Sequence, residues 1–289
     1  MSVCKISPGD LHDFNPAEGP VWFEYLLYIP CTQYQYLSAT FTLPRKESTQ
    51  PVPAVLLCHG FTGNRIETRR LFVLLSRQLA ARGIASLRFD YRGSGESSGD
   101  FSEFCFTDYV IDAEHALVFL RTLNAVDSKR IGILGYSLGG CVASYLVGAH
   151  AGDFAAICLW APVADTRSII ETFYGEHIDL KKIVGDSPDE CMYDFNGVPI
   201  SNRFIRELWE TNPLEQITAA LGPVFICHGT DDETVPPHHT EKYHKVLTSQ
   251  KKSVEIYWQN KANHSFNSIE QTNAILSKST RWLGETLGT

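Results

Sequence analysis

The sequence predicts an α/β fold with a mostly parallel central sheet covered by helices on both faces. Short continuous apolar runs from residue 53 onward alternate with longer stretches of helical spacing, as in successive β-α-β units. These runs are apolar at almost every position, as strands buried on both faces of a parallel sheet must be. With 289 residues, 44% of them hydrophobic, the chain is long enough to bury such a core.

The expected elements follow in order along the chain. Two segments with some alternation, 21–30 and 36–44, are predicted to pair as antiparallel strands that close at Pro30 and Pro44. Buried strands are then expected at 54–60, 84–90, 130–137, 155–162 and 223–230. Helical spacing marks 69–83 and 108–124, a last strand is expected at 253–259, and a closing amphipathic helix at 269–287.

One stretch interrupts this rhythm. After the run LWAPVAD, no strand of the buried type appears until GPVFICHG, although a βα connection usually needs only about two to six residues. We interpret residues 163–215 as a cap inserted into a core domain that comprises residues 1–162 and 216–289. The apolar content of this segment suits either a substrate pocket or a homodimer contact.

Charge and cysteine usage exclude several classes of function. The 25 Lys and Arg residues against 33 Asp and Glu residues give a net charge of −8, so nucleic acid and anionic lipid surfaces are not expected as partners. No apolar run approaches the roughly 20 residues of a membrane helix, and no signal peptide is recognised at the start. The eight cysteines form no C-x-x-C pair, and several lie inside apolar runs. We therefore expect a cytoplasmic protein with buried thiols, without membrane insertion, a zinc site or a disulfide framework.

The stretch RIGILGYSLGG places Ser137 where a predicted strand ends and a helix begins. Gly135 and Gly139 remove the Cβ atoms that would clash in so sharp a turn. The serine then stands at the carboxyl end of a strand, where open α/β sheets bind ligands, and the Leu138 N–H is free to face a developing oxyanion. A lone G-x-S-x-G also occurs for packing alone, so other stretches must support a catalytic interpretation.

Three other stretches supply that support. LLCHGFTGN ends an earlier strand and offers the N–H of Phe61 as a second oxyanion donor. HGTDDETVP ends a later strand with an acid, and NHSF follows the last strand with His264. The chain order of serine, acid and histidine, each after a strand, is the order found in α/β-hydrolases.

On these residues the sequence resembles the α/β-hydrolase superfamily, and within it the small bacterial serine esterases of the cinnamoyl (feruloyl) type. The matching pieces span nearly the whole chain and are HGFTGNR, FDYRGSGESSGDF, GYSLGG, DFNGVPIS, HGTDDETVP and NHSF. The resemblance implies the α/β-hydrolase fold and a serine hydrolase that cleaves small-molecule esters of short-chain acyl or hydroxycinnamoyl groups. It implies a triad of Ser137, Asp232 and His264, with no metal or organic cofactor.

The acid of the triad has alternatives. The form H-G-x-x-D-x-x-V-P in similar enzymes selects Asp232, while Asp231 and Glu233 are expected to be solvated loop charges. Asp165 is a further candidate because some relatives place the acid after the preceding strand. Asn263 stands before His264 where relatives often carry aspartate, which leaves the histidine assignment intact.

Substrate contacts are harder to assign from the sequence. The candidates for binding are His59, Tyr136, Phe173, Tyr174 and Trp209, and two of the five cap aromatics, which include Tyr193 and Phe195, are expected to touch substrate. Other polar residues have structural interpretations. His59 shapes the oxyanion loop, and His228 is a hydrogen-bonded histidine at a strand end. His238 and His239 begin a surface helix. Asp90 and Arg92 brace a loop, and Cys141 is a packed helix residue.

Two rival functions remain open. The nearer rival is another acyl hydrolase on the same fold, namely a monoacylglycerol lipase, a thioesterase or a peptidase, because the pocket rather than the triad selects the substrate. The more distant rival is a ligand-binding protein that has kept the fold and lost turnover.

Overall fold

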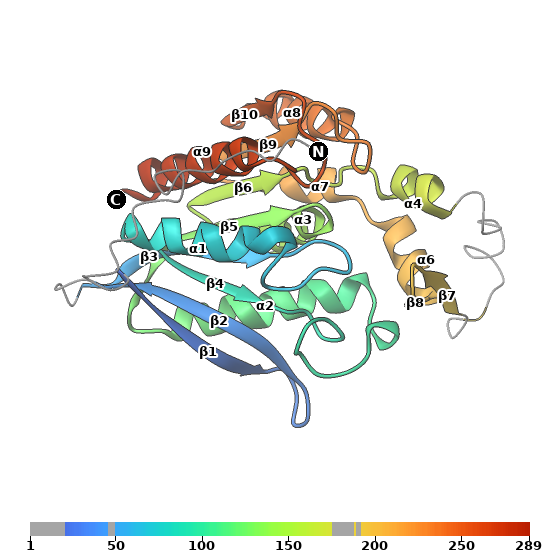
Figure 1. Cartoon of the computed structure of the whole chain (residues 1–289), viewed down its shortest axis with the longest axis horizontal. Coiled ribbons are helices and arrows are strands. Elements are labelled where there is room, and N and C mark those ends of the chain that lie inside the picture. The colour runs from blue at the N-terminus through green and yellow to red at the C-terminus, as the bar shows by residue number, and fades with distance from the viewer. Residues whose placement is uncertain (1–20, 46–49, 175–187, 189–191) are drawn as a thin grey trace, which may run out of the picture.

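The computed structural model describes residues 21–45, 50–174, 188 and 192–289. Its main sheet has eight strands in the order β1-β2-β4-β3-β5-β6-β9-β10 (Figure 1). Only the β1/β2 and β2/β4 pairs are antiparallel, so the prediction of a mostly parallel sheet is confirmed. The strands are β1 (Trp22–Pro30), β2 (Tyr36–Pro44), β3 (Val52–Cys58), β4 (Ala85–Phe89), β5 (Val126–Tyr136), β6 (Ala156–Trp160), β9 (Val224–Gly229) and β10 (Val254–Gln259).

Helices cover both faces of this sheet. Side chains of α1 and α9 share one apolar core, and side chains of α2, α3 and α8 share the other. Strand β3 shows why its sequence is continuously apolar, because Leu56 enters one core while Val55 and Leu57 enter the other. The helices are α1 (Leu71–Ala81), α2 (Phe106–Thr122), α3 (Leu138–Ala149), α8 (His238–Ser249) and α9 (Ile269–Leu287), with short 3₁₀ helices at Thr68–Arg70 and Phe101–Glu103.

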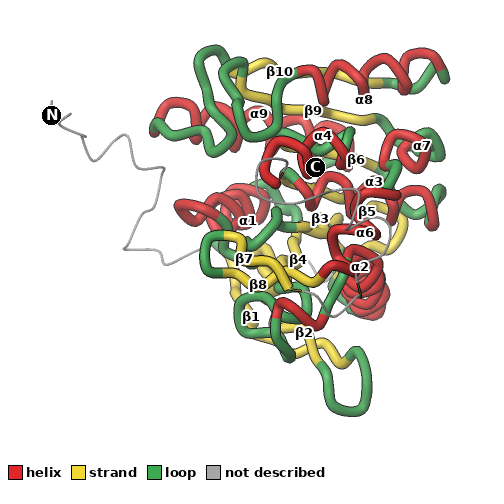
Figure 2. The backbone as a smooth tube through the Cα atoms, turned by 90° about the vertical axis from the view of Figure 1, so that its right-hand side faces the viewer, coloured by secondary structure: helices red, strands yellow, loops and turns green. Residues whose placement is uncertain are grey.

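The long connection between β6 and β9 contains its own small elements. These are α4 (Thr166–Tyr174), β7 (Met192–Phe195), β8 (Val198–Ser201), α6 (Asn202–Glu210) and α7 (Pro213–Ile217). Strands β7 and β8 form a separate antiparallel pair. Helix α6 buries Phe204, Ile205 and Leu208. Figures 1 and 2 place α4, α6 and this hairpin at the carboxyl ends of the parallel strands, beyond the edge of the main sheet.

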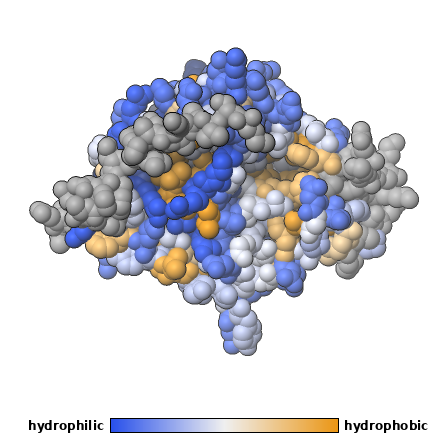
Figure 3. Space-filling model, in the orientation of Figure 1, coloured by the Kyte–Doolittle hydropathy of each residue, from blue (hydrophilic) through white to orange (hydrophobic). Residues whose placement is uncertain are grey.

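The outer surface is mixed in character. Figure 3 shows one face that is largely hydrophilic, with apolar side chains in separate groups. Strand β1 is an edge strand, and its Leu26 and Tyr28 are exposed. Within the described residues, no helix combines the length and apolar character needed to cross a membrane.

Candidate active site

The turn around Ser137 joins β5 directly to α3. Ser137 has φ 57° and ψ −121°, a backbone conformation that is unfavourable for a residue with a side chain. A Cβ atom at Gly139 would lie 2.1 Å from the carbonyl oxygen of Cys58, and one at Gly135 would lie 2.3 Å from the carbonyl oxygen of Gly139. Glycine is therefore required at both positions, as the sequence indicated, and the tight packing holds the serine at the end of its strand.

A hydrogen-bonded chain links three side chains from three strand ends. Ser137 follows β5, Asp232 follows β9 and His264 follows β10, and these parallel strands end at the same edge of the sheet. Oγ of Ser137 lies 3.0 Å from Nε2 of His264, and Nδ1 of His264 lies 2.7 Å from Oδ2 of Asp232. In this geometry the imidazole donates from Nδ1 to the carboxylate and accepts from the serine hydroxyl at Nε2.

The carboxylate of Asp232 is buried and well supplied with donors. Its Oδ1 accepts hydrogen bonds from the backbone N–H groups of Thr234 and Val235, at 2.9 and 2.8 Å. Burial by itself raises the pKa of Asp232, but hydrogen bonds from His228 and His264 outweigh burial and lower this pKa to about 2. The group is consequently ionised at neutral pH and suited to hold an imidazole.

The alternative acids stand elsewhere. Asp231 is exposed and accepts a hydrogen bond from the hydroxyl of Thr230, and Glu233 is also exposed. Asp165 is ion-paired with Lys242, with 2.6 Å between its Oδ2 and Nζ. Of the four candidates, Asp232 is the acid whose carboxylate contacts His264.

Two backbone amides beside Ser137 are suited to bind an oxyanion. Leu138 is the first residue of α3, where N–H groups have no acceptor within the helix. Phe61 follows β3 in the loop that packs against Ser137. Within the described residues, neither the Phe61 nor the Leu138 N–H donates a hydrogen bond, and both residues border the cavity beside the serine. Both amides are thus free to donate to a bound molecule.

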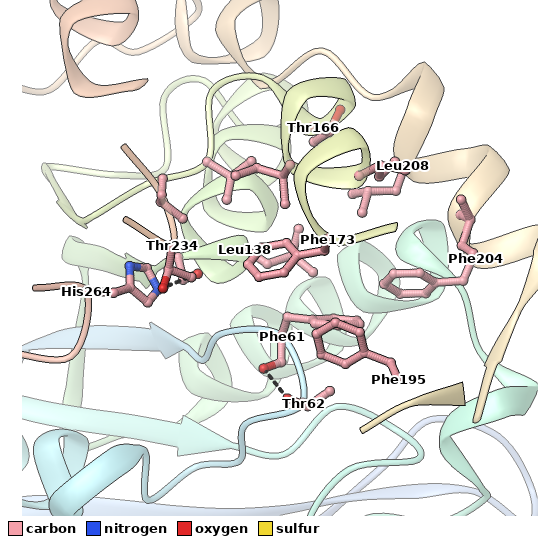
Figure 4. Close-up of a pocket in the computed structure, with 16 residues that line it drawn as sticks. Phe61, Thr62, Leu138, Thr166, Phe173, Phe195, Phe204, Leu208, Thr234 and His264 are labelled. Atoms are coloured by element: carbon pink, nitrogen blue, oxygen red, sulfur yellow. Dashed lines mark hydrogen bonds between the residues drawn. The ribbon is translucent and has the colours of Figure 1, made fainter. Parts of the chain in front are cut away.

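An apolar cavity of about 240 Å³ extends from Ser137 and His264 toward the 163–215 segment. Figure 4 shows His264 at one end and Phe204 and Leu208 at the other, with the ring of Phe173 between them. Among the described lining residues, His264 has the only titratable side chain. The lining residues are Phe61, Thr62, Ser137, Leu138, Val163, Thr166, Ile169, Ile170, Phe173, Phe195, Phe204, Ile205, Leu208, Thr234, Val235 and His264.

Aromatic rings join the main domain to the 163–215 segment at this cavity. The ring of Phe61 lies 5.3 Å from that of Phe195 and 5.5 Å from that of Phe204, centroid to centroid. The rings of Phe173 and Phe195 are 5.9 Å apart. Phe61 thus contributes a backbone amide next to Ser137 and a ring to the wall of the cavity.

Three of the sequence-based substrate contacts do not line this cavity. His59 is 1% exposed, and both ring nitrogens are occupied: Nδ1 contacts the carbonyl oxygen of Gly60 and Nε2 accepts the N–H of Tyr91. Tyr136 is turned toward His264, where its hydroxyl donates to the carbonyl oxygen of that residue at 2.9 Å and its ring stacks on the imidazole. Trp209 packs under the guanidinium of Arg167 instead.

The aromatic residues named for the cap divide between the cavity and other positions. Phe173 and Phe195 line the cavity, whereas Tyr193 does not. The side chain of Tyr174 lies outside the described part of the structure. Sequence reasoning missed Phe204, Ile205 and Leu208, although their spacing on the amphipathic helix α6 was a usable signal.

The other histidines considered in the sequence, which are not part of the Ser137–His264–Asp232 triad, have structural positions. His228 is a hydrogen-bonded histidine at the end of β9, as expected. His238 and His239 begin α8, which has an exposed outer face, as expected. His239 itself is completely buried on the inner side of this helix, where its Nδ1 accepts the N–H of Ala164 at 3.0 Å. Burial, together with the positive charges of neighbouring groups, lowers the pKa of His239 to about 3. Among the described residues, no group of three or more His, Cys, Asp or Glu side chains is arranged to bind a metal ion.

Comparisons with known proteins agree with this geometry. Residues 72–289 match the model of the prolyl oligopeptidase family. The whole chain is 25% identical, over 309 aligned residues, to 39% of the acylamino-acid-releasing enzyme of Rattus norvegicus, so it spans about two fifths of that relative's length. An uncharacterized peptidase, YtmA of Bacillus subtilis, is 24% identical over 208 residues, which cover 71% of this chain and 74% of the relative.

The solved structures show the same fold. Est1E from Butyrivibrio proteoclasticus, determined with bound ferulic acid, superimposes with a TM-score of 0.79 at 23% identity and covers 91% of this chain and 100% of its own. The predicted α/β-hydrolase fold is thereby confirmed. The comparisons include both esterases and peptidases, so they support a serine hydrolase without selecting between the two.

Proposed function

The chain belongs to the prolyl oligopeptidase family, and from that premise we propose that this serine hydrolase cleaves carboxylic esters of small apolar acyl or aryl groups. Short-chain acyl and hydroxycinnamoyl esters are the proposed substrates. The cavity beside Ser137 is the observation that carries the proposal, because its described walls are largely apolar and include no Asp, Glu, Lys or Arg side chain. No metal or organic cofactor takes part in the proposed reaction.

The proposed mechanism uses the hydrogen-bonded triad of Ser137, His264 and Asp232. His264 accepts the proton of Ser137 as the serine oxygen attacks the ester carbonyl, and Asp232 keeps the imidazole in the tautomer that has Nε2 free. The amides of Phe61 and Leu138 stabilise the tetrahedral oxyanion, an effect worth about 3 kcal/mol per donor at comparable sites. Water activated by His264 then releases the acid from the acyl-enzyme.

The composition of the cavity favours an ester over a peptide. A peptide carries N–H and C=O groups on both sides of the scissile bond, and each group that is buried without a partner costs about 1–3 kcal/mol. Thr62, Thr166 and Thr234, together with Ser137 and His264, are the described polar side chains in the wall. An acyl or aryl group needs no such partners, and four phenylalanine rings offer it an aromatic surface.

A peptidase remains the second candidate, since the rat relative is named for the release of acylamino acids. An N-acylated amino acid has no charged amino group, so it would place no unpaired ammonium in the cavity. Such a substrate still brings an amide into an apolar site, which is why we rank it second.

An ester and an amide with related acyl groups separate the two candidates. We expect the wild-type protein to hydrolyse p-nitrophenyl 3-phenylpropanoate and methyl ferulate, and to leave N-acetylphenylalanine p-nitroanilide nearly untouched. Cleavage of the anilide at a kcat/KM comparable with that of the esters would favour the peptidase. Hydrolysis of p-nitrophenyl decanoate alone would favour a lipase, and an acyl-CoA tests for a thioesterase.

We further propose that residues 163–215 act as the cap over this site, since α4, β7 and α6 supply Phe173, Phe195 and Phe204 to the cavity wall. We also propose that the protein is cytoplasmic. The described cysteines support that location, because all six are free thiols and five of them are buried.

A further inference from the structure

The oxyanion loop is backed by a carboxylate that the proposed mechanism does not use. We propose that Glu67 is a positioning residue, whose carboxylate holds the amide of Gly60 and thereby aims the N–H of Phe61 at the oxyanion of the reaction. This inference rests on the proposed function, because it assigns a role in the same site.

The carboxylate of Glu67 accepts two backbone hydrogen bonds. Its Oε1 lies 2.7 Å from the N–H nitrogen of Gly60, and its Oε2 lies 3.0 Å from that of Thr68. A Cβ atom at Gly63 would lie 2.9 Å from Oε1, so a glycine there leaves room for the carboxylate. Hydrogen bonds from N–H groups to an ionised carboxylate are about twice as strong as neutral ones. Burial raises the pKa of Glu67, and the hydrogen bonds from Gly60 and Thr68 oppose that rise because they stabilise the charged form. Glu67 is therefore a firm anchor for Gly60.

The backbone of Glu67 is strained in order to reach this position. Its φ of 61° and ψ of 167° fall in a region that is essentially reserved for glycine. A non-glycine residue in such a region costs on the order of 1–3 kcal/mol, and surrounding contacts must hold it there. The strained turn directs the carboxylate to Gly60. The strain lowers the stability of the loop, and the resulting hydrogen bond fixes the position of the Gly60 amide.

The peptide bond after Gly60 is held as well. The carbonyl oxygen of Gly60 lies 2.9 Å from Nδ1 of His59 and 3.1 Å from the N–H nitrogen of Gly63. Nε2 of His59 accepts the N–H of Tyr91, so Nδ1 carries the hydrogen and donates it to Gly60. In a trans peptide the N–H points away from the C=O of the same unit, and no described peptide bond is cis. The N–H of Phe61 is thus directed away from His59.

Gly60 connects these two fixed peptide units next to the nucleophile. A Cβ atom on Gly60 would lie 3.3 Å from Cβ of Ser137, so the loop touches the serine residue itself. Glu67 holds the N–H of the His59–Gly60 peptide unit. His59 and Gly63 hold the carbonyl oxygen of the Gly60–Phe61 peptide unit. If the Glu67 contact is lost, the His59–Gly60 peptide unit is free to rotate, and the N–H of Phe61 loses its alignment with the oxyanion.

Two variants test this role. In Glu67→Gln the side chain keeps an oxygen for Gly60 but loses its charge, and we expect kcat for p-nitrophenyl butyrate to fall roughly tenfold. In Glu67→Ala the Gly60 N–H loses its acceptor, and we expect a roughly hundredfold fall, at the low end of the 10²–10³ that removal of an oxyanion donor costs. KM is expected to stay within about twofold in both variants, because alignment of the oxyanion donor acts in the transition state.

A transition-state analogue distinguishes positioning from general damage to the fold. A trifluoromethyl ketone forms a tetrahedral adduct with the serine, so its affinity is expected to fall in proportion to kcat/KM in the Glu67 variants. Asp127→Asn is the matched control, since Asp127 accepts the N–H of Lys129 at 3.0 Å at the start of β5, the opposite end of that strand from Ser137. The control is expected to keep wild-type kinetics and inhibitor affinity.

The outcomes separate this inference from the proposed function. Wild-type kcat in folded Glu67→Gln and Glu67→Ala proteins overturns the role of Glu67 while leaving the esterase intact. A raised KM with unchanged kcat overturns it too, because that pattern indicates a contact with the bound substrate. If Glu67→Ala does not fold, the Gln variant carries the test alone. Absence of Ser137-dependent hydrolysis in the wild type overturns both proposals.

Discussion

His228 Nε2 lies 3.1 Å from Oδ2 of Asp232, the same oxygen that His264 contacts at 2.7 Å. The triad acid therefore lies between two imidazoles, one leading to the nucleophile and one buried behind it. Nδ1 of His228 lies 2.6 Å from the hydroxyl of Thr240, and Nε2 also contacts the carbonyl oxygen of Val235 at 2.8 Å. These contacts fit an imidazole that donates from Nε2 and holds the acid in place.

Replacement of His228 tests this second imidazole. His228→Phe keeps a ring next to Trp258 but removes the donor to Asp232. We expect the free energy of unfolding to fall by about 1–3 kcal/mol, because buried partners are left unpaired, and kcat to fall about tenfold. Urea denaturation and steady-state kinetics check both values. Unchanged kinetics in a folded variant would show that His264 alone suffices to hold Asp232.

The identity of the acid is tested by two neighbouring substitutions. Asp232→Asn is expected to lower kcat by about 10⁴, because an asparagine no longer holds the imidazole in its useful tautomer. Asp231→Asn is the matched control on the same loop, and its exposed side chain predicts a change of less than about twofold. Rates are measured with p-nitrophenyl butyrate at neutral pH, and the opposite ranking of the two variants would transfer the role to Asp231.

The buried histidine His239 predicts a loss of stability in acid. Its pKa is lowered from 6.5 to about 3, so below pH 6.5 the unfolded chain binds a proton that the folded chain does not. The stability linked to this group is full above pH 6.5 and declines by about 1.4 kcal/mol per pH unit as the pH falls toward 3. Urea denaturation at pH 7 and pH 5 should show about 2 kcal/mol of this loss.

A variant isolates that contribution. His239→Asn offers an amide oxygen to the N–H of Ala164 and does not titrate. We expect its loss of stability between pH 7 and pH 5 to be smaller than that of the wild type by about 2 kcal/mol. Equal losses in the two proteins would mean that His239 does not stay neutral in the folded state.

The cavity wall predicts selective effects on substrate size. Phe195→Ala removes a ring from the wall and is expected to raise KM for p-nitrophenyl 3-phenylpropanoate about tenfold, the equivalent of about 1.4 kcal/mol of lost apolar contact. KM for p-nitrophenyl acetate should change much less, since an acetyl group offers little apolar surface for contact with that ring. Tyr193→Ala, on the same strand but outside the cavity wall, is the control. Equal effects on both esters would argue against this cavity as the acyl site.

Local patterns were enough to predict the buried strands and the turn at Ser137. The turn at Ser137 depends on Gly135 and Gly139, which are its near neighbours in the sequence, and continuous apolar runs identify buried strands without knowledge of their partners. The choice of Asp232 over Asp231 and Asp165 came from the resemblance to α/β-hydrolases, and the structure places Asp232 and His264 at the same edge of the sheet as Ser137.

Side chains whose environment comes from distant segments were not predictable in the same way. His239 begins a surface helix after two prolines, yet its side chain is buried and its Nδ1 accepts the N–H of Ala164, 75 positions earlier. Phe204 faces the cavity because Phe61 packs against it from a different part of the chain. Glu67 lies in a loop with no periodic pattern, and only the folded turn brings its carboxylate to Gly60.

The central claim is that Ser137 is the nucleophile of an ester hydrolase. The most direct measurement compares hydrolysis of p-nitrophenyl butyrate by the wild-type protein and by Ser137→Ala, after circular dichroism has shown that both are folded. We predict readily measurable turnover by the wild type and a fall to near the background rate in Ser137→Ala. Equal rates in the two proteins would contradict the assignment of Ser137, and absence of turnover in both would contradict ester hydrolysis.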